Sequence, residues 1–286
     1  MKRLLIGFMV AAVAAIGFGG ATASASNNPT SYLALGDSVA FGYSPLLNPT
    51  DADNFIGYPD EVAAALKENL TNASCPGETS SHFIDLSGSD NGCGAWRFYY
   101  KFPLHAAYST AQLAFADSFI QSHPKTLVVS IDIGANDLFV LEHLCGGSST
   151  PLTPLEIQCI LAGLPSMLAT LSANLDTIYG HIRNLDGYHH KLVALTYYSL
   201  NYTDAITTGV ISQVNQVVAA RTLAWGGIVA DGFGAFAVAS AAYGGDTCAA
   251  GLRIVVSTSP LTCDIHPSPA GRDLLAQAIV KALRPD

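Results

Sequence analysis

Residues 32–42 read Tyr-Leu-Ala-Leu-Gly-Asp-Ser-Val-Ala-Phe-Gly, and the interpretation of the whole chain starts from this stretch. The apolar run at 32–35 predicts a short buried strand, and the three residues that follow it have the composition of a turn. Open α/β sheets bind ligands at the carboxyl ends of their strands, so Ser38 stands where a nucleophile would be placed. The alternative is a strand end followed by an ordinary polar turn. The nucleophile hypothesis therefore requires a base and oxyanion donors elsewhere in the chain.

The first 25 residues have the pattern of a secretory signal peptide. Lys2 and Arg3 form a basic start, an apolar run follows at 4–15, and residues 23–25 form an A-x-A cleavage site. We therefore expect cleavage near Ala25, secretion, and a single domain over residues 26–286. The alternative is an uncleaved anchor, which the short run and its interrupting glycines disfavour. No later stretch is expected to be long and apolar enough to span a membrane.

The mature chain carries a strong negative charge. Of the 13 Lys and Arg, Lys2 and Arg3 leave with the leader, so 11 remain against 22 Asp and Glu, a net charge of −11 with histidine neutral. Such a surface repels phosphate backbones and anionic lipid headgroups. We therefore expect no nucleic-acid partner and no stable membrane insertion. A mature chain of roughly 260 residues is long enough for one well-buried α/β domain, which we expect to be a monomer.

Six cysteines follow the leader, and an even number in an exported chain favours disulfides over metal binding. No C-x-x-C occurs, and no cluster of Cys and His has the spacing of a zinc site. We therefore expect neither a metal nor an organic cofactor. The cysteines fall into three couples that are close in sequence, and these predict the pairs Cys75–Cys93, Cys145–Cys159 and Cys248–Cys263.

Strand and helix patterns alternate along the chain, which is typical of parallel βαβ units. The expected fold is α/β, a three-layer α/β/α sandwich with a central parallel sheet of about five strands, with neither an internal repeat nor a second domain. Strands are predicted at 32–35, 71–74, 126–132, 191–198 and 228–230, and helices at 58–70, 108–121, 161–185, 206–225 and 269–283.

Two irregular segments interrupt this alternation. The first, at 86–103, is long for a loop in a compact domain, so it needs a function or a covalent tie. Its aromatic residues either line a substrate cleft or cover the core, and both interpretations stay open. The second segment, at 145–159, is expected to be a surface flap closed by its own disulfide. The aromatic residues of the first are Trp96, Phe98, Tyr99 and Tyr100.

Histidine is the most common base for a catalytic serine. His266 is the best candidate, because the Cys263 disulfide and Pro267 would hold its imidazole in a rigid turn before the last helix. A serine followed by a histidine near the C-terminus fits acyl transfer, and the absence of G-x-S-x-G excludes the nucleophile elbow of α/β-hydrolases. The other histidines lie at helix ends or in loops and are expected to be solvated or to cap helices; they are His82, His105, His123, His143, His181, His189 and His190.

Four blocks in this order resemble those of the SGNH (GDSL-type) hydrolase superfamily, and the resemblance runs from about residue 32 to the C-terminus. Gly-Asp-Ser at 36–38 resembles the first block, which implies that Ser38 is the nucleophile. His266 with the proline after it resembles the last block, which implies that His266 is the general base. Asp37 is adjacent to the serine along the chain and is interpreted as a residue that forms the turn.

The two middle blocks imply an oxyanion hole. Gly77, within residues 74–79, resembles the second block, whose glycine N–H faces the oxyanion. Asn136, within Gly-Ala-Asn-Asp at 134–137, resembles the third block, whose amide is a second donor. With the backbone N–H of Ser38, the resemblance implies three donors for one developing charge. Taken alone, an Asn after a strand fits the cap of a helix or turn equally well.

One residue departs from the pattern of the family. Members usually carry an Asp three residues before the His, as D-x-x-H, but Cys263 occupies that position and Asp264 lies only two residues before His266. Either Asp264 reaches the imidazole through a tighter turn, or a backbone carbonyl orients it, as in members of the family with a dyad.

The resemblance implies a secreted serine esterase or lipase, similar to the actinobacterial branch of the superfamily. It would hydrolyse carboxylic esters, such as acyl lipids, through an acyl-enzyme on Ser38. Two alternatives stay open: O-deacetylation of a polysaccharide, and non-catalytic binding of carbohydrate or cell wall in the same cleft. Apolar residues expected at the mouth of the site suggest a lipid-like or aryl ester; they are Phe41, Tyr43, Trp96 and Phe98.

Overall fold

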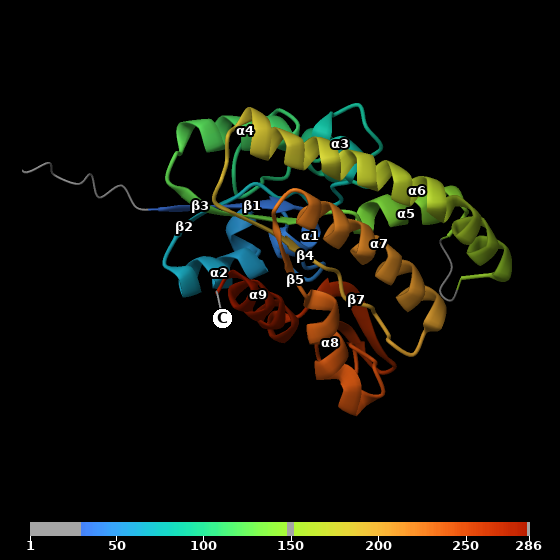
Figure 1. The fold of residues 1–286 in the computed structure, drawn as a ribbon. Coiled ribbons are helices and arrows are strands. Elements are labelled where there is room, and N and C mark those ends of the chain that lie inside the picture. The colour runs from blue at the N-terminus through green and yellow to red at the C-terminus, as the bar shows by residue number, and fades with distance from the viewer. Residues whose placement is uncertain (1–29, 148–151, 285–286) are drawn as a thin grey trace, which may run out of the picture.

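A computed structural model describes residues 30–147 and 152–284 (Figure 1). The expected signal peptide lies outside the described residues. At the centre is a parallel sheet of five strands in the order β2-β1-β3-β4-β5. The strands are β1 (Ser31–Gly36), β2 (Asn69–Asn72), β3 (Thr126–Asp132), β4 (Lys191–Leu195) and β5 (Ile228–Ala230).

The two central strands show why the sheet forms here. Strands β1 and β3 are buried on both faces, so their side chains form continuous apolar runs instead of alternating with polar ones. The strands pair in register, with Leu33 opposite Val129 and Leu35 opposite Ile131. Their carboxyl ends therefore lie side by side, which places the residues after each strand at one edge of the sheet.

Helices cover both faces of the sheet (Figure 1). The expected three-layer α/β/α sandwich with a parallel sheet of five strands is confirmed. A short helix, α1 (Ser38–Phe41), directly follows β1. On one side lie α3 (Ser80–Ile84), α4 (Gln112–Ser122), α5 (Ala135–Leu144), α6 (Pro154–Gly180) and α7 (Ala205–Ala224), and on the other α2 (Tyr58–Leu66), α8 (Gly232–Ser240) and α9 (Pro269–Leu283).

Helix α6 is the longest element that the structure describes. It begins with a capping box, in which the Thr153 hydroxyl and the Glu156 carboxylate each accept a backbone N–H of the other residue. With the turn that follows, Pro154–Leu185 is long and apolar enough to cross a membrane, with a mean hydropathy of 1.4 in its best window. The expectation that no such stretch follows the leader was therefore wrong. Leu164 and Leu171 on its inner face are buried against the rest of the domain, as in a covering helix of an α/β fold.

A two-stranded antiparallel hairpin lies outside the main sheet and was not predicted. It consists of β6 (Arg253–Thr258) and β7 (Leu261–Pro267). His266 lies in β7, so the expected rigid turn around it was wrong. The prediction failed because both strands are largely solvent-accessible and carry no regular alternation of apolar and polar residues.

Several boundaries also differ from the prediction. The helix expected over 58–70 ends at Leu66, because Lys67 takes a left-handed conformation with φ of 59°. The second strand therefore begins at Asn69 instead of residue 71. The helix expected from residue 108 begins at Gln112. The short helices α1, α3, α5 and α8 were missed, and the long loop at 86–103 contains a π-helical turn at Ala95–Tyr99.

The structure contains the three disulfides proposed from the spacing: Cys75–Cys93, Cys145–Cys159 and Cys248–Cys263. The first closes the long loop that follows β2, the second ties the end of α5 to α6, and the third anchors β7. Cysteines in this state fit a protein that folds in an oxidising compartment.

Candidate active site

Three segments meet at the carboxyl end of β1. Ser38 is the first residue of α1, and Asp37 caps that helix by accepting the Val39 N–H at 2.9 Å. Gly36 ends the strand with φ of 136°, and a Cβ there would lie 2.2 Å from a carboxylate oxygen of Asp132, so this tight turn requires glycine. The local geometry thus presents the Ser38 side chain beyond the edge of the sheet.

The structure brings His266 and Asp264 to this serine. The Ser38 hydroxyl lies 2.8 Å from His266 Nε2, a hydrogen-bond distance across 228 residues of chain. On the opposite side of the ring, His266 Nδ1 makes a short hydrogen bond with Asp264 Oδ1, which also accepts the His266 backbone N–H at 3.0 Å. In this arrangement the imidazole can remove the proton of the hydroxyl, and the carboxylate lies behind the imidazole.

Asp264 is placed to keep a negative charge behind the imidazole. Burial alone would raise the pKa of its carboxyl, but the hydrogen bond with His266 and the electrostatic interaction with that ring hold the pKa below its ordinary value. The alternative of a backbone carbonyl behind His266 has no such contact among the described residues, where the Nδ1 atom faces Asp264.

Two other contacts position the base. The hydroxyl of Tyr198 donates to the carbonyl oxygen of Ile265 at 2.6 Å and so fixes β7 next to His266. The ring of Tyr43 packs edge-on against the imidazole, with 4.7 Å between ring centroids. His266 itself is 8% exposed. Neither tyrosine was expected in these roles.

Asn136 lies in the first turn of α5, so it belongs to a helix instead of merely following a strand. Its Nδ2 donates to Asp37 Oδ2 at 3.1 Å, and its Oδ1 accepts from Asn91 Nδ2 at 2.7 Å. The amide is therefore held at both ends, within reach of the turn that carries Ser38. It lines the same cavity as Ser38 and His266.

Gly77 lies in the turn after β2 with φ of 82°, a conformation that favours glycine. A Cβ at this position would lie 2.5 Å from the backbone oxygen of Asn91. Its carbonyl oxygen accepts the Asn91 N–H at 3.2 Å. Gly77 is not among the residues that line the cavity at Ser38, so its connection to the site runs through Asn91.

Asp37 and Asp132 form a buried carboxyl pair beneath the serine, and each is 1% exposed. They are hydrogen-bonded to each other, and burial raises the pKa of both, with that of Asp132 well above its usual range. Asp37 also accepts from Val39 N, Asn136 Nδ2 and, at 2.6 Å, from the hydroxyl of Tyr197. With these three donors aimed at Asp37, the shared proton belongs on Asp132 and the charge on Asp37.

A largely apolar cavity of about 560 Å³ opens at Ser38 and His266. The lining residues come largely from α5, α6 and the start of α7, and from the segment after β4, where Ser199, Asn201 and Asp204 add polar groups. Glu142 also lines it, and burial raises the pKa of its carboxyl. The apolar residues of the lining include Leu138, Phe139, Leu152, Ile157, Ile160, Leu161, Val210 and Ile211.

The aromatic residues expected at the mouth do not line this cavity. Phe41 and Trp96 pack with Phe55 in a separate buried cluster, on which Tyr43 also rests. Of the residues proposed for the mouth, Tyr43 is the one whose ring packs against His266. Phe98 and the two tyrosines after it are exposed. The loop at 86–103 therefore covers the core with Trp96 and contributes to the site through Asn91.

His82 was expected to be solvated or to cap a helix, and this was wrong. It is 2% exposed, and its Nδ1 lies 2.5 Å from Glu78 Oε1. Glu78 precedes it by four residues, a spacing that brings two side chains together on one turn. Glu78 also groups with Cys75 and Cys93, but both cysteines are in a disulfide and offer no thiolate to a metal.

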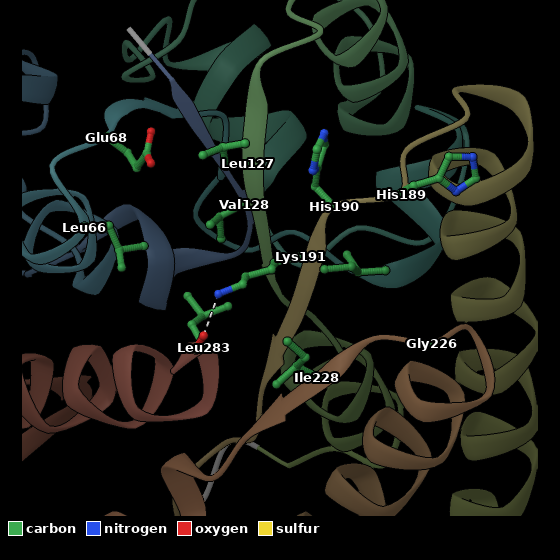
Figure 2. Close-up of a pocket in the computed structure, with 11 residues that line it drawn as sticks. Leu66, Glu68, Leu127, Val128, His189, His190, Lys191, Gly226, Ile228 and Leu283 are labelled. Atoms are coloured by element: carbon green, nitrogen blue, oxygen red, sulfur yellow. Dashed lines mark hydrogen bonds between the residues drawn. The ribbon is translucent and has the colours of Figure 1, made fainter. Parts of the chain in front are cut away.

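A second cavity, of about 540 Å³, lies at the amino ends of β3, β4 and β5 (Figure 2). Its polar groups are Glu68, His189, His190 and Lys191, and the ammonium of Lys191 donates to the carbonyl oxygen of Leu283 at 2.6 Å. No serine or cysteine lines this cavity in the part of the chain that the structure describes. The candidate site is therefore the one at the carboxyl ends.

Comparisons with known proteins agree with this fold. A family model described as the GDSL-like Lipase/Acylhydrolase family matches residues 34–274, which include Ser38, Gly77, Asn136 and His266. Curated protein sequences give no match to this chain.

Three solved structures are similar in fold. An extracellular lipase from Streptomyces rimosus is 20% identical, with 88% of this chain and 99% of that chain covered and a TM-score of 0.57. Phospholipase A1 from Streptomyces albidoflavus NA297 is 20% identical, with 89% and 99% covered and a TM-score of 0.55. The acetylxylan esterase Axe2 from Geobacillus stearothermophilus is 16% identical, with 90% and 95% covered and a TM-score of 0.52.

Proposed function

This chain belongs to the GDSL-like lipase/acylhydrolase family, and from that premise we propose that it is a secreted serine esterase or lipase that hydrolyses carboxylic esters. One observation carries the proposal: the Ser38 hydroxyl lies 2.8 Å from His266 Nε2, at the opening of an apolar cavity. This pair supplies a nucleophile with its base, and the cavity supplies a place for the acyl group.

In the first half of the proposed reaction, the proton of the Ser38 hydroxyl moves to His266 Nε2 while the serine oxygen bonds to the ester carbonyl carbon. The Asp264 carboxylate stabilises the imidazolium that forms. The carbonyl oxygen becomes an oxyanion, for which the backbone N–H groups of Ser38 and Gly77 and the amide of Asn136 are the proposed donors. The C–O bond to the alcohol then breaks, and the alcohol leaves with the proton from Nε2.

In the second half, water attacks the acyl-enzyme and passes a proton to His266 Nε2. The bond between the acyl carbon and the Ser38 oxygen breaks, the carboxylic acid leaves, and the proton returns to the serine. Every proton in this scheme is carried by His266, so the reaction needs no metal or organic cofactor.

The cavity supports an ester with an apolar acyl group. Its wall of Leu, Ile and Val side chains between α5, α6 and α7 offers no hydrogen-bonding partner to a substrate, which favours an alkyl chain over a sugar at that position. The polar groups of the segment after β4 line the same cavity and suit the alcohol part of the ester.

The proposed location outside the cell rests on two features. Residues 1–25 have the pattern of a cleaved signal peptide, and all six cysteines are in disulfides. Disulfides persist in oxidising compartments. We propose that residues 26–286 form one secreted catalytic domain that acts as a monomer on small or lipid esters.

A panel of p-nitrophenyl esters from acetyl to palmitoyl, tested on wild type and Ser38→Ala, examines this function. We expect wild type to hydrolyse acyl chains longer than acetyl more efficiently, and Ser38→Ala to be inactive on all of them. Labelling of wild type by a serine-directed phosphonate, absent in Ser38→Ala, provides a readout without turnover. Failure of wild type both to turn over an ester and to react with the phosphonate would contradict the proposal and favour non-catalytic carbohydrate or cell-wall binding.

Polysaccharide O-deacetylation is the second candidate, and one observation favours it. The polar residues Asn201, Asp204 and Thr207 line the same cavity as Ser38, which suits hydroxyl groups of a sugar. The same ester panel separates the two functions, because a deacetylase would prefer acetyl esters and would release acetate from an acetylated polysaccharide.

A further inference from the structure

Asn91 is a half-buried residue in the loop closed by the Cys75–Cys93 disulfide, and it contacts both proposed oxyanion residues outside the serine turn. Its backbone N–H donates to the carbonyl oxygen of Gly77 at 3.2 Å. Its side-chain Nδ2 donates to Asn136 Oδ1 at 2.7 Å, across 45 residues of chain. One residue thus ties together the turn after β2 and the first turn of α5.

The contacts of Asn136 with Asn91 and Asp37 together decide which way its amide points. A carboxamide has one accepting end and one donating end, and only the donating end stabilises a negative charge. Asn91 offers an N–H to the accepting end, and the charged carboxylate of Asp37 takes one N–H of the donating end at 3.1 Å. If the Asn136 amide were rotated by half a turn, its N–H groups would face the N–H of Asn91. Its oxygen would then face the carboxylate oxygen of Asp37. The second N–H of Asn136 is thereby left for a ligand in the cavity that this residue lines.

The contact with Gly77 holds the turn that carries the second proposed donor. The Gly77 backbone has φ of 82°, and it passes so close to Asn91 that a Cβ would lie 2.5 Å from the Asn91 oxygen. Gly77 and Asn91 each lie two residues inside a cysteine of the disulfide, at 75 and 93. The hydrogen bond between them therefore closes a small ring of backbone and holds the peptide plane that follows Gly77. The preceding plane, which carries the Gly77 N–H, is joined to it at the Gly77 Cα, so the turn has little freedom to move.

We propose that Asn91 is a positioning residue for the oxyanion hole: its side chain orients the Asn136 amide, and its backbone N–H holds the turn at Gly77 through the Gly77 carbonyl oxygen. Asn91 does not touch the substrate in this scheme. The inference rests on the proposed function, because it assigns a role in stabilising an oxyanion that the esterase mechanism creates.

Asn91→Asp is the sharpest test, since it keeps the size of the side chain and the backbone contact with Gly77 but replaces the donor with an acceptor. The ionised carboxylate would face Asn136 Oδ1 with no proton between them. We expect kcat to fall by about 10–100-fold, less than the loss of a whole oxyanion donor, with KM changed by less than about threefold.

Two readouts separate positioning from a general structural role. The first is the ratio of kcat/KM for an oxoester to that for the thionoester with the same acyl group. This ratio should fall in Asn91→Asp, because sulfur accepts hydrogen bonds weakly and profits little from aligned donors. The second is the activity of Asn91→Asp relative to wild type as the pH is lowered toward the ordinary pKa of Asp, about 3.9. The relative activity should rise, because a protonated carboxyl can again donate to Asn136.

Asn54→Asp is the matched control. Its amide donates to the carbonyl oxygen of Asn48 in an exposed loop, so the same chemical change should leave all these values as in wild type. Asn91→Ala removes the donor without adding a charge, and it should also lower kcat and the oxoester preference. Melting temperatures of the variants show how much of the protein is folded in each assay.

If Asn91→Asp keeps the kcat and the oxoester preference of wild type while Ser38→Ala is inactive, the proposed role of Asn91 is wrong. The proposed function is then unaffected. A loss of kcat that only follows the fraction of unfolded protein overturns the role of Asn91 as well. A wild type that hydrolyses no ester overturns both proposals.

Discussion

The two halves of the candidate site are built in different ways. The half that would move protons is a single line of contacts from Ser38 to His266 to Asp264, and its base stands on the β6–β7 hairpin outside the main sheet. The half that would bind the oxyanion lies at the carboxyl edge of the main sheet. There Asn136 is held by two side chains, and Gly77 lies in a loop closed by a disulfide.

This difference predicts how each half responds to damage. A linear arrangement works as a unit, so the loss of any member should remove most of its contribution. The oxyanion half, which we call the braced arrangement, has several donors for one charge, so the loss of one donor leaves the others in place. The predictions below test this contrast, from the largest expected effect to the smallest.

Ser38→Ala and His266→Ala should each lower kcat by about 10⁶-fold, because neither residue can act without the other. The double variant should be no slower than either single variant. The measurement is single-turnover hydrolysis of a p-nitrophenyl ester by the three variants, with melting temperatures to show that they are folded. Losses that multiply in the double variant would mean that the two residues do not act as a unit.

Asp264→Asn should lower kcat by about 10⁴-fold, because the neutral amide no longer stabilises the imidazolium and can hold the ring in the wrong tautomer. Near-normal turnover would remove Asp264 from the line of contacts and favour a backbone carbonyl as the group that orients His266.

The same variant has an effect on stability with a defined sign. The pKa of Asp264 is lowered in the folded state, so its contribution to stability is present above the unfolded-state value of about 3.8 and is lost as the pH falls through the folded-state value. Asp264→Asn should remove this part of the acid sensitivity in urea unfolding followed from pH 6 to pH 2. An unchanged acid profile would show that the contact with His266 does not persist in solution.

Asn136→Ala should lower kcat by about 10²–10³-fold and change KM little, because the amide acts on charge that develops only in the transition state. This loss is far smaller than that of Ser38→Ala, since two backbone donors would remain. Initial rates over a range of ester concentrations give the two constants separately. A loss as large as that of Ser38→Ala would contradict the braced arrangement.

The carboxyl pair of Asp37 and Asp132 lies under both halves and should affect stability more than rate. Asp132→Ala should lower the free energy of unfolding by about 1–3 kcal/mol, because the Tyr58 hydroxyl and the Ala40 N–H lose their acceptor. Asp132→Asn should cost less, because an amide resembles the protonated carboxyl that we assign to this residue.

The pH dependence of this pair has the opposite sign to that of Asp264. Burial raises the pKa of Asp132 in the folded state, so its contribution to stability is present at low pH and is lost as the pH rises through the folded-state value. Wild type should therefore lose stability more steeply than Asp132→Asn as the pH rises above the unfolded-state value of about 3.8. If the free energies of unfolding of the two proteins changed with pH in parallel, the shared proton would not lie on Asp132.

The sheet was the most predictable part of the fold. The strands at 126–132 and 228–230 and the helix at 269–283 have the predicted bounds. Strands buried on both faces leave a continuous apolar run in the sequence, and a covering helix leaves a periodic one. The β6–β7 hairpin has neither signal, because most of its residues are accessible to solvent on both sides. Short helices such as α1 and α3 were missed because little more than one turn has no measurable period.

The site was predictable only where a local motif marks it. Ser38, Asn136 and His266 were singled out by the residues next to them, and the structure brings all three to the wall of one cavity. The contact of Asp264 with His266 was left open, since it depends on the conformation of two residues in β7. Asn91 and Tyr197 carry no motif at all, and their partners lie 45 and 160 residues away along the chain.

The sequence by itself determined the alternation of strands and helices, the three cysteine couples and the segments that carry Ser38, Gly77, Asn136 and His266. These features depend on periodicity and on neighbouring residues, which a linear chain displays directly. Only the tertiary structure decided the group behind His266, the orientation of the Asn136 amide and the apolar lining of the cavity. Each of these is a contact between distant segments, and such a contact exists only after the strands have paired and their carboxyl ends have come together.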